Sequence, residues 1–574
     1  MDHDVTVWAT NIKKAKQRLE GLHNRMDDTQ EMIEGTFQIP ATEGVFDQYT
    51  ANDAAVLADT AANIIGNGAP FTSIPIQYGS KKARKSFSEA EQFVEGLFAV
   101  SDQNLTQIPE STDWMSQQGW FAPNRGWLAQ RVILFEEDDE LIPDIRPWDV
   151  RNTLWWPGSK GTLWSIYMRR LTVDAVEQEY GETVTGDNEN EVNVYDIWDD
   201  EENGVLVSSG EKAFDWVKSP KPHHIGHNPV HILPVGNRPY VIGGDGLVNV
   251  GKDILFNDRH LIEVKSRVAS YVLTTCGTAA KTPNIVEWDG AQGDPPDFSQ
   301  TDVTQKGGTI PIDISRGEKF YPGVQPQIPQ YMIRFLEMVQ RDISIGGISA
   351  VVQGMTQGAM PGVTLQQLTQ GALKILNPYI QTVEKSRSWA ANELVRQFNA
   401  LDKAKGMHVE GVDRQGYVYS LDRKPGDLPE NPRFQTRIVA NILQDKQTNL
   451  AMAAAARAPG PNGRPLLSDE TIRDEFHLVQ DTDAEDEKID KEKVYSFFSL
   501  AARRVIAALR KDGDDEDANL LDAEVAKQQE QPQGQQGTPP GIPVKPPITA
   551  RAGQIQDQPN LMQRAMNRLK GLRR

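Results

Sequence analysis

The chain has 574 residues, 38% of them hydrophobic and 24% charged, which is typical of a folded protein with more than one core. Its 60 basic and 80 acidic residues give a formal net charge of −20, which argues against a protein whose whole surface holds DNA statically, since that requires a basic face. The single cysteine, Cys276, excludes an intrachain disulfide and a cysteine-based metal cluster. The sequence contains no apolar run of about 18 residues, so no membrane-spanning helix is predicted, and residues 1–4 are not expected to begin a signal peptide.

The first 246 residues alternate helical and strand-like segments. Apolar residues at helical spacing predict a helix over 5–34, and further helices are predicted at 53–65 and at 89–105, the last from a capping box of Ser88 and Glu91. Strand-like runs follow at 127–136, 163–171, 191–198, 204–208 and 231–235. The tryptophans among them are better explained by core packing than by base stacking: Trp114, Trp120, Trp127, Trp148, Trp155, Trp156 and Trp164. We expect an α+β domain with an antiparallel sheet.

The middle of the chain is predicted to contain two helices that flank a β-rich segment. Apolar residues at helical spacing predict a helix of about 28 residues over 247–274. A segment rich in Pro, Gly and strand-forming residues follows at 276–327. A second helix is predicted to begin at Pro329, a favoured first-turn residue. Its apolar stripe consists of Met332, Phe335, Val339 and Ile343.

Residues 346–362 are the most unusual stretch. They contain five glycines, and no charged residue occurs between Asp342 and Lys374. A surface loop normally carries charge, so this loop is predicted to be flexible, polar and electrically neutral. A long helix follows, from about 363 to 402, with Pro378 in its interior. The proline ring removes a helical hydrogen bond and clashes one turn back, so a kink is expected there.

The last part of the chain is predicted to change from strands to helices and then to lose regular structure. Strands are predicted at 417–421 and 434–439, and helices from Ser468 and over 484–511. Residues 527–558, rich in Gln, Pro and Gly, are predicted to be disordered. Residues 560–574 form a basic amphipathic pattern that suits DNA, a membrane surface or a partner protein, or a solubilising tail, and these alternatives remain open.

One pattern suggests an enzyme. Residues 246–252, from Gly246 to Lys252, match most of a phosphate-binding loop. Asp253, however, stands where such a loop needs Ser or Thr, and a carboxylate there would repel phosphate. The segment is also predicted to lie inside a continuous helix. No nucleophile motif is present, so we predict no catalytic residue and no cofactor.

Two clusters of polar residues have a simpler interpretation than chemistry. His223, His224, His227 and His231 lie within nine positions and could bind zinc or nickel, although prolines interrupt the segment. A solvated loop leading into a strand is favoured, and no metal site is predicted. The acidic run 136–140 is interpreted as a solvated hairpin tip, and residues 514–517 likewise as a solvated turn.

The order of these parts resembles that of the portal proteins of tailed double-stranded DNA bacteriophages. Residues 145–150 resemble the position-defining strand of the family, and 231–235 followed by 246–255 resemble the strand that enters the first stem helix. Residues 346–362 followed by 365–376 resemble the tunnel loop and the long helix after it. The match covers most of residues 1–510, and its specificity lies in the order and spacing of the motifs.

The resemblance implies an α+β, mainly helical, portal-like fold with these parts: wing 1–246, stem helix 1 at 247–275, β-rich clip 276–327, stem helix 2 at 328–345, tunnel loop 346–362, long kinked helix and wing return strands 363–439, helical crown 440–526, and a disordered tail with a basic terminal helix, 527–574. It also implies a homomeric ring, usually of twelve subunits, at a unique capsid vertex. The ring would form the channel for DNA packaging and ejection, in the virion and, during assembly, in the host cytoplasm. The implied partners are double-stranded DNA, the terminase large subunit, a head-completion or adaptor protein, and the major capsid and scaffold proteins, without a membrane.

On this interpretation the neutral loop touches passing DNA and releases it. Lys or Arg would form charge-assisted bonds to phosphate, and Asp or Glu would repel it. The DNA-facing residues would be Gln353, Met355, Thr356, Gln357 and Met360, and the hinge or kink positions Gly346, Gly347, Gly362 and Pro378. A phosphate-loop-like nucleotide-binding motor and a capsid scaffold or adaptor without a channel are the alternatives. The subunit count, the phage type, the tail class and the role of residues 527–574 are left open.

Overall fold

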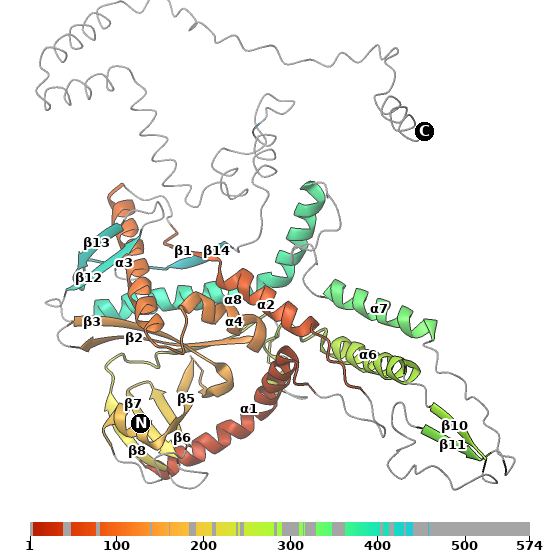
Figure 1. The fold of residues 1–574 in the computed structure, drawn as a ribbon. Helices are drawn as coiled ribbons and strands as arrows, with labels where there is room; N and C mark the ends of the chain where they lie inside the picture. Colours follow the sequence, from red (N-terminus) through yellow and green to blue (C-terminus); the bar gives the residue numbers. More distant parts are fainter. Residues whose placement is uncertain are drawn as a thin grey trace, which may run out of the picture. The chain divides into compact units, whose positions relative to one another are not determined.

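The fold was determined as a computed structural model (Figure 1). The chain divides into two units, residues 1–480 and 481–574. The structure describes residues 4–37, 47–75, 81–137, 140–159, 161–182, 191–208, 214–236, 239–240, 246–280, 284–289, 309–313, 315, 329–346, 362–401, 406–412, 418–429, 432–439 and 457. The helices predicted from Ser468 and over 484–511, the crown and the tail lie outside these residues.

Four helices begin the fold. Helices α1 (Val5–Glu34) and α2 (Asp53–Gly66) are confirmed where they were predicted. Helix α3 (Lys81–Thr106) begins earlier than expected, so the predicted capping box is wrong. Glu91 lies inside the helix and accepts a hydrogen bond from the Ile74 amide at 2.7 Å, so its side chain fastens a neighbouring segment. Helix α4 (Trp114–Arg125) was not predicted and contains Pro123.

A five-stranded antiparallel sheet follows, in the order β4-β5-β6-β7-β8. The strands are β4 (Thr153–Pro157), β5 (Thr162–Thr172), β6 (Glu191–Asp199), β7 (Glu202–Ser208) and β8 (Phe214–Pro222), and η1 (Val150–Asn152) precedes them. Alternate residues of β6 face opposite sides. Tyr195 and Ile197 join the core under α1, whereas Val192 and Val194 pack with Val176 of α5 (Val173–Tyr180). The predicted strands and their antiparallel pairing are confirmed.

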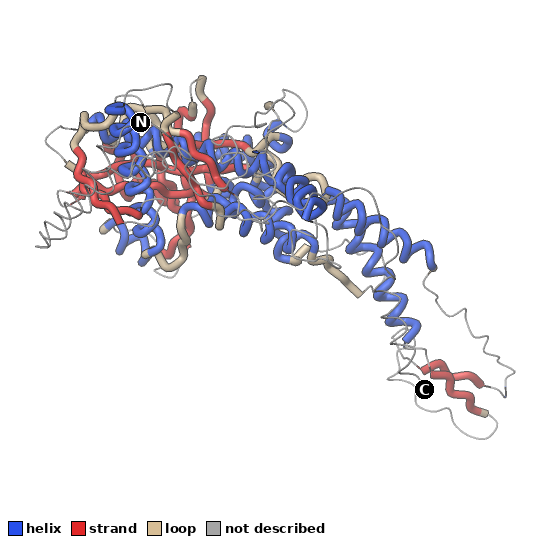
Figure 2. Tube along the Cα trace, turned by 90° about the horizontal axis from the view of Figure 1, so that it is seen from above, coloured by secondary structure: helices blue, strands red, loops and turns tan. Residues whose placement is uncertain are grey.

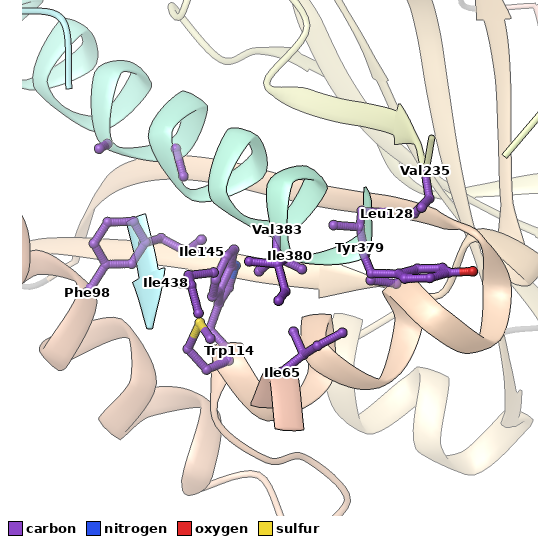
Figure 3. Close-up of a cluster of buried hydrophobic side chains, with 14 of the residues drawn as sticks. Ile65, Phe98, Trp114, Leu128, Ile145, Val235, Tyr379, Ile380, Val383 and Ile438 are labelled. Carbon is purple, nitrogen blue, oxygen red and sulfur yellow. The ribbon is translucent and has the colours of Figure 1, made fainter. Parts of the chain in front are cut away.

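A three-stranded antiparallel sheet carries the largest core. Its order is β3-β2-β9, with β2 (Trp127–Glu137), β3 (Glu140–Trp148) and β9 (Val230–Pro234). Helices α3, α4 and α8 pack against it. Figure 3 shows Tyr379 and Val383 of α8 beside Trp114 of α4, Leu128 of β2 and Ile145 of β3, all buried. Figure 2 shows most of the strands gathered together with helices around them.

Core packing of the tryptophans is confirmed for the most buried ones. Trp114, Trp127, Trp148 and Trp155 are each at most 5% exposed. The remaining three are half-buried, and two of them, Trp156 and Trp164, stack on each other with ring centroids 6.1 Å apart. No described tryptophan needs base stacking to explain its position.

Three strand pairs complete the described sheets. Antiparallel pairs are formed by β1 (Ala69–Ser73) with β14 (Gln435–Val439) and by β12 (Met407–Val412) with β13 (Val418–Arg423). A parallel pair, β10 (Asn284–Trp288) with β11 (Thr309–Asp313), lies in the segment predicted to be rich in strands, and that prediction is confirmed.

The predicted helix over 247–274 is wrong in its first half. A short 3-10 helix, η2 (Gly246–Asn249), is followed by turns, and α6 (Arg259–Ala280) begins only at Arg259. Gly251 explains the break, because its φ of 70° is left-handed and a Cβ there would lie 2.2 Å from Nε1 of Trp127. That indole nitrogen donates to the Val250 carbonyl at 2.9 Å. The apolar residues of this segment therefore pack as a loop.

The two helices on either side of the neutral segment are confirmed. Helix α7 (Gln330–Gly346) begins directly after Pro329 and packs against α6. Helix α8 (Gly362–Ala400) has 39 residues with Pro378 inside it, and Figure 1 shows it bending part of the way along.

Candidate functional site

The candidate site is the neutral segment between α7 and α8. Gly346 is the last residue of α7, and Gly362 is the first of α8. Gly347, Gln353, Met355, Thr356, Gln357 and Met360 lie outside the described residues. Their proposed contact with DNA therefore stays a prediction, and the described helices show what holds the segment's two ends.

Helix α7 carries two apolar stripes, not one. Val339 and Ile343, 2% and 6% exposed, belong to the main core. Tyr331, Phe335 and Met338 lie on another face and are 72%, 38% and 51% exposed. The predicted apolar stripe is therefore split, since Val339 and Ile343 face the core whereas Phe335 is exposed. A contiguous exposed apolar stripe marks an interaction surface.

Helix α8 is fastened to β14 by a regular ladder. Glu384, Ser388 and Asn392 lie one helical turn apart. They accept hydrogen bonds from alternate backbone amides of the chain entering β14, from Ile438 at 2.8 Å, Thr436 at 2.8 Å and Phe434 at 3.0 Å. This ladder fixes the part of α8 that follows Pro378.

A buried polar bridge fixes the same part of α8 to β2. The Trp114 indole donates to Oε1 of Gln130 at 2.9 Å, and Nε2 of Gln130 donates to the Ser386 carbonyl at 2.7 Å. The next residue of α8 is Arg387. Its guanidinium donates to Glu95 at 2.8 Å and lies 3.7 Å from the ring centre of Phe98. Trp114, Gln130 and Arg387 are each at most 3% exposed, so the bridge fixes α8 deep in the fold.

Glu393 makes a third attachment of α8. Burial would raise the pKa of its carboxyl, but hydrogen bonds from His227, Arg396 and Gln397 outweigh burial and lower that pKa to about 2. The His227 ring lies 3.1 Å from Oε2, and Nη2 of Arg396 donates to Oε1 at 2.8 Å. Gln397 also donates to the Val132 carbonyl of β2 at 2.9 Å. The second part of α8 is thus fixed to β2 and to the loop before β9 by the same carboxylate.

The residues of the phosphate-loop-like pattern have structural roles. Asp253, 2% exposed, lies 3.3 Å from Arg259 and 3.6 Å from Arg25, and burial raises the pKa of its carboxyl against the effect of these two arginines. The Lys252 ammonium lies 4.8 Å from the ring centre of Phe256. The segment is a turn-rich connection, so its predicted location inside a continuous helix is wrong. Asp253 holds α1 to the start of α6.

The histidine cluster does not converge. Nε2 of His223 lies 3.0 Å from the Asp199 carbonyl, His227 faces Glu393, and the His231 ring stacks on Trp389 with centroids 4.5 Å apart. The loop before β9 is confirmed. In the described ranges, no three His, Cys, Asp or Glu side chains are arranged to hold a metal ion.

The acidic run is a hairpin tip, as predicted. Glu136 and Glu137 end β2, Glu140 begins β3, and all three are exposed, while Asp138 and Asp139 lie outside the described residues. Among the described helices, none combines the length and the apolar character that crossing a bilayer requires.

Comparison with known proteins gives only remote similarities. No protein family and no curated protein matches the chain. Among solved structures, it is similar to a chain of the neck of an empty gene transfer agent (GTA) particle computed with C6 symmetry, with 10% identity over 79% of this chain and 94% of that one and a TM-score of 0.38. A chain of the virion of a native gene transfer agent particle gives 9% identity, 79% and 99% coverage and a TM-score of 0.35. A chain of the neck of a native GTA particle computed with C12 symmetry has 11% sequence identity with this chain and a TM-score of 0.34. The match covers 74% of this chain and 98% of that one. Likenesses this weak establish neither the family nor the function of this chain.

Proposed function

We propose that the chain is a portal subunit, which forms a homomeric ring around a DNA channel at one capsid vertex and catalyses no reaction of its own. The observation that carries this proposal is the neutral, glycine-rich stretch 346–362, which joins two helices with different anchoring. Helix α8 is fixed to the core after Pro378, whereas α7 exposes an apolar stripe. In this proposal the segment faces DNA and α8 holds it in place.

The parts of the ring follow the chain order. Residues 1–246 would form the wing, α6 and α7 the stem, and the connection with β10 and β11 the clip, where terminase and a head-completion protein dock in turn. The return strands β12 to β14 would belong to the wing, and residues 440–526 to the crown. Pro378 lets α8 change direction between the channel and the wing, because its ring breaks the helical hydrogen-bond ladder.

A second copy of this chain would cover the exposed stripe of α7. Tyr331, Phe335 and Met338 form one contiguous exposed apolar stripe, and neighbouring subunits in a ring would bury it. We expect Tyr331→Asp with Met338→Asp to prevent ring formation while the subunit stays folded. Leu163→Asp, which changes a 50% exposed residue of β5, is the matched control and should assemble. Normal rings from the double variant would exclude this stripe from the interface.

The role of the neutral segment is tested by adding charge. Gln357→Lys with Met360→Lys should give rings that assemble but load less DNA, because each ammonium would form charge-assisted bonds to phosphate. Gln17→Lys with Ile108→Lys adds the same charge on exposed positions of the wing and should package normally. Unchanged packaging by the first variant would remove the segment from its proposed role.

A further inference from the structure

Helix α7 offers two different surfaces on its opposite flanks. One flank carries the exposed apolar residues Tyr331, Phe335 and Met338, here called the stripe. Gln340 stands nine residues after Tyr331, which is about two and a half helical turns, so these two side chains leave the helix in opposite directions. The core-facing residues of α7 lie between the two flanks. The two flanks therefore meet different neighbours in any assembly.

The second flank of α7 forms one wall of a groove of about 560 Å³. Figure 1 shows α6 and α7 side by side, and the two helices are in contact. The groove between them is lined by Lys265 and Ala269 of α6, Tyr49 before α2, and Leu336, Gln340 and Arg341 of α7. Most of the lining surface is apolar. The groove is thus a concave apolar site, and its volume lies within the range of binding pockets.

The three segments around the groove are joined to one another. The Tyr49 amide donates to the Ser270 hydroxyl at 2.9 Å, which holds residue 49 against α6. Nζ of Lys265 lies 2.6 Å from Oδ2 of Asp53, the first residue of α2. Gln340 accepts a hydrogen bond from the same ammonium, and its amide donates to Oδ1 of Asp53 at 3.4 Å. The groove is therefore formed before a partner binds, which reduces the entropy cost of binding.

A closed ring of more than two subunits places two different surfaces against each other. Each subunit offers one surface to the next subunit and a complementary surface to the previous one. The stripe and the groove meet this requirement, because one protrudes, the other is concave, and they lie on opposite flanks of one helix. They also overlap along α7. Rotation about the ring axis keeps every residue at its own height, so the two surfaces of neighbouring subunits meet at the same level.

The charges beside the two surfaces are complementary. Along α7, the stripe is accompanied by Arg334 and then Asp342, whereas the groove is lined by Glu337 and then Arg341. All four side chains are exposed. The order of signs is opposite on the two flanks, so neighbouring subunits related by rotation would place unlike charges together. Two stripes packed on each other in parallel would place like charges together, and in either direction they would leave the groove uncovered.

We propose that the stripe of each subunit inserts into the groove of the next, which makes a head-to-tail interface between copies of this chain. This inference rests on the proposed function, since the ring supplies the second copy, and it names the surface that the stripe contacts. Aromatic side chains that fill a desolvated pocket carry most of the binding energy of an interface. The exposed charges fix the alignment of the subunits and contribute little affinity.

Mixing two variants that cannot assemble tests the pairing. Tyr331→Asp with Met338→Asp damages only the stripe, and Ala269→Arg, at a half-buried residue, fills only the groove. Each variant alone should remain monomeric in a mass measurement. Their equimolar mixture contains one intact stripe and one intact groove, so we expect particles of two subunits and no rings. A mixture that stays monomeric, or normal rings from Ala269→Arg, would overturn the proposal.

His260→Arg is the matched control for the groove variant. His260 is 83% exposed and stands nine residues before Ala269, so it lies on the opposite face of α6. This variant adds the same side chain to the same helix outside the groove, and it should form rings like the wild type. If His260→Arg abolishes rings as Ala269→Arg does, the effect does not come from the groove and the pairing loses its support.

Cross-linking is a second test and requires no disruptive substitution. In a Cys276→Ser background, one chain carries Met338→Cys, and a coexpressed chain with a longer tag carries Ala269→Cys. A short thiol-specific cross-linker should join the two different chains far more efficiently than it joins Met338→Cys to a His260→Cys chain. Cross-links only between two Met338→Cys chains would mean that stripes contact each other, and an absence of cross-links between the different chains would equally refute the pairing.

The outcomes separate the pairing from the proposed function. Closed rings that cross-link from stripe to stripe would leave the portal proposal in place and refute the pairing. Open filaments that cross-link from stripe to groove would support the pairing and contradict a closed channel, because a head-to-tail contact forms a ring only when its rotation closes.

Discussion

His231→Phe tests whether burial of one imidazole makes the fold sensitive to acid. The His231 ring stacks on Trp389 of α8 at an interplanar angle of 9°, and its register partner on β2 is Gln130. Burial lowers the pKa of this imidazole from 6.5 to about 4. Phenylalanine keeps the stacking and removes the titrating group, so the variant separates the charge from the packing.

The sign and size of the expected change in the free energy of unfolding follow from proton linkage. Between pH 6.5 and pH 4 the unfolded chain binds a proton at this ring and the folded chain does not, so the stabilisation present above pH 6.5 is lost as the pH falls. With these two pKa values, His231 costs the folded state about 2 kcal/mol at pH 5 relative to pH 7.5. The phenylalanine variant should therefore gain about that much over the wild type at pH 5.

The assay is urea unfolding of both proteins at pH 7.5 and pH 5, followed by circular dichroism. We expect the difference in free energy of unfolding between variant and wild type to change by about 2 kcal/mol between the two conditions. His260→Phe, at a side chain that is 83% exposed, is the control and should leave the pH dependence unchanged. An equal pH dependence for His231→Phe and the wild type would refute the assignment of a buried neutral imidazole.

Two further substitutions test the framework around α8 and α6. Gly251→Ala places a Cβ 2.2 Å from Trp127 Nε1 at a φ of 70°. It should lower the thermal midpoint of unfolding clearly more than Gly181→Ala, whose φ is 73° but whose Cβ meets nothing within 4 Å. Equal shifts of the midpoint would mean that the contact with Trp127 is relaxed. Gln130→Leu leaves the buried Trp114 indole without its acceptor and should cost about 1–3 kcal/mol in urea unfolding, whereas an unchanged stability would show that the bridge contributes nothing.

The sequence predicted the regular elements best where one apolar face meets a core. The spacing from Trp8 to Met26 predicted α1 with its correct bounds, because those residues do face one core. The same spacing failed at 247–258, where Val250, Ile254 and Leu255 are buried in turns. Periodicity cannot distinguish these cases, since it records burial and not the path of the backbone. Gly251, which needs a left-handed φ, was the signal against a helix.

Side-chain partners from distant segments explain the other errors. Ser88 with Glu91 fits a helix start, but Glu91 binds the Ile74 amide inside α3, which no local pattern reveals. Phe335 fits the predicted apolar stripe of α7, but it is 38% exposed, since α6 covers only part of that helix.

The candidate site was predictable only as a composition. The absence of charge from 346 to 362 and the glycines within it are facts of the sequence, and the structure adds the helices at both ends. The surface that would close a ring was not predicted. Of its residues, only Phe335 had been placed in an apolar stripe, and amphipathic spacing does not say which apolar residues meet the same chain and which meet another.

The most direct test of a channel is electron cryomicroscopy of the purified, assembled protein, with the mass of the particle measured in parallel. We predict closed rings with a central hole, with residues 347–361 lining its narrowest part and Tyr331 and Met338 buried between neighbouring subunits. A stable monomer at high concentration, or a ring that carries residues 347–361 on its outer surface, would contradict the proposed function.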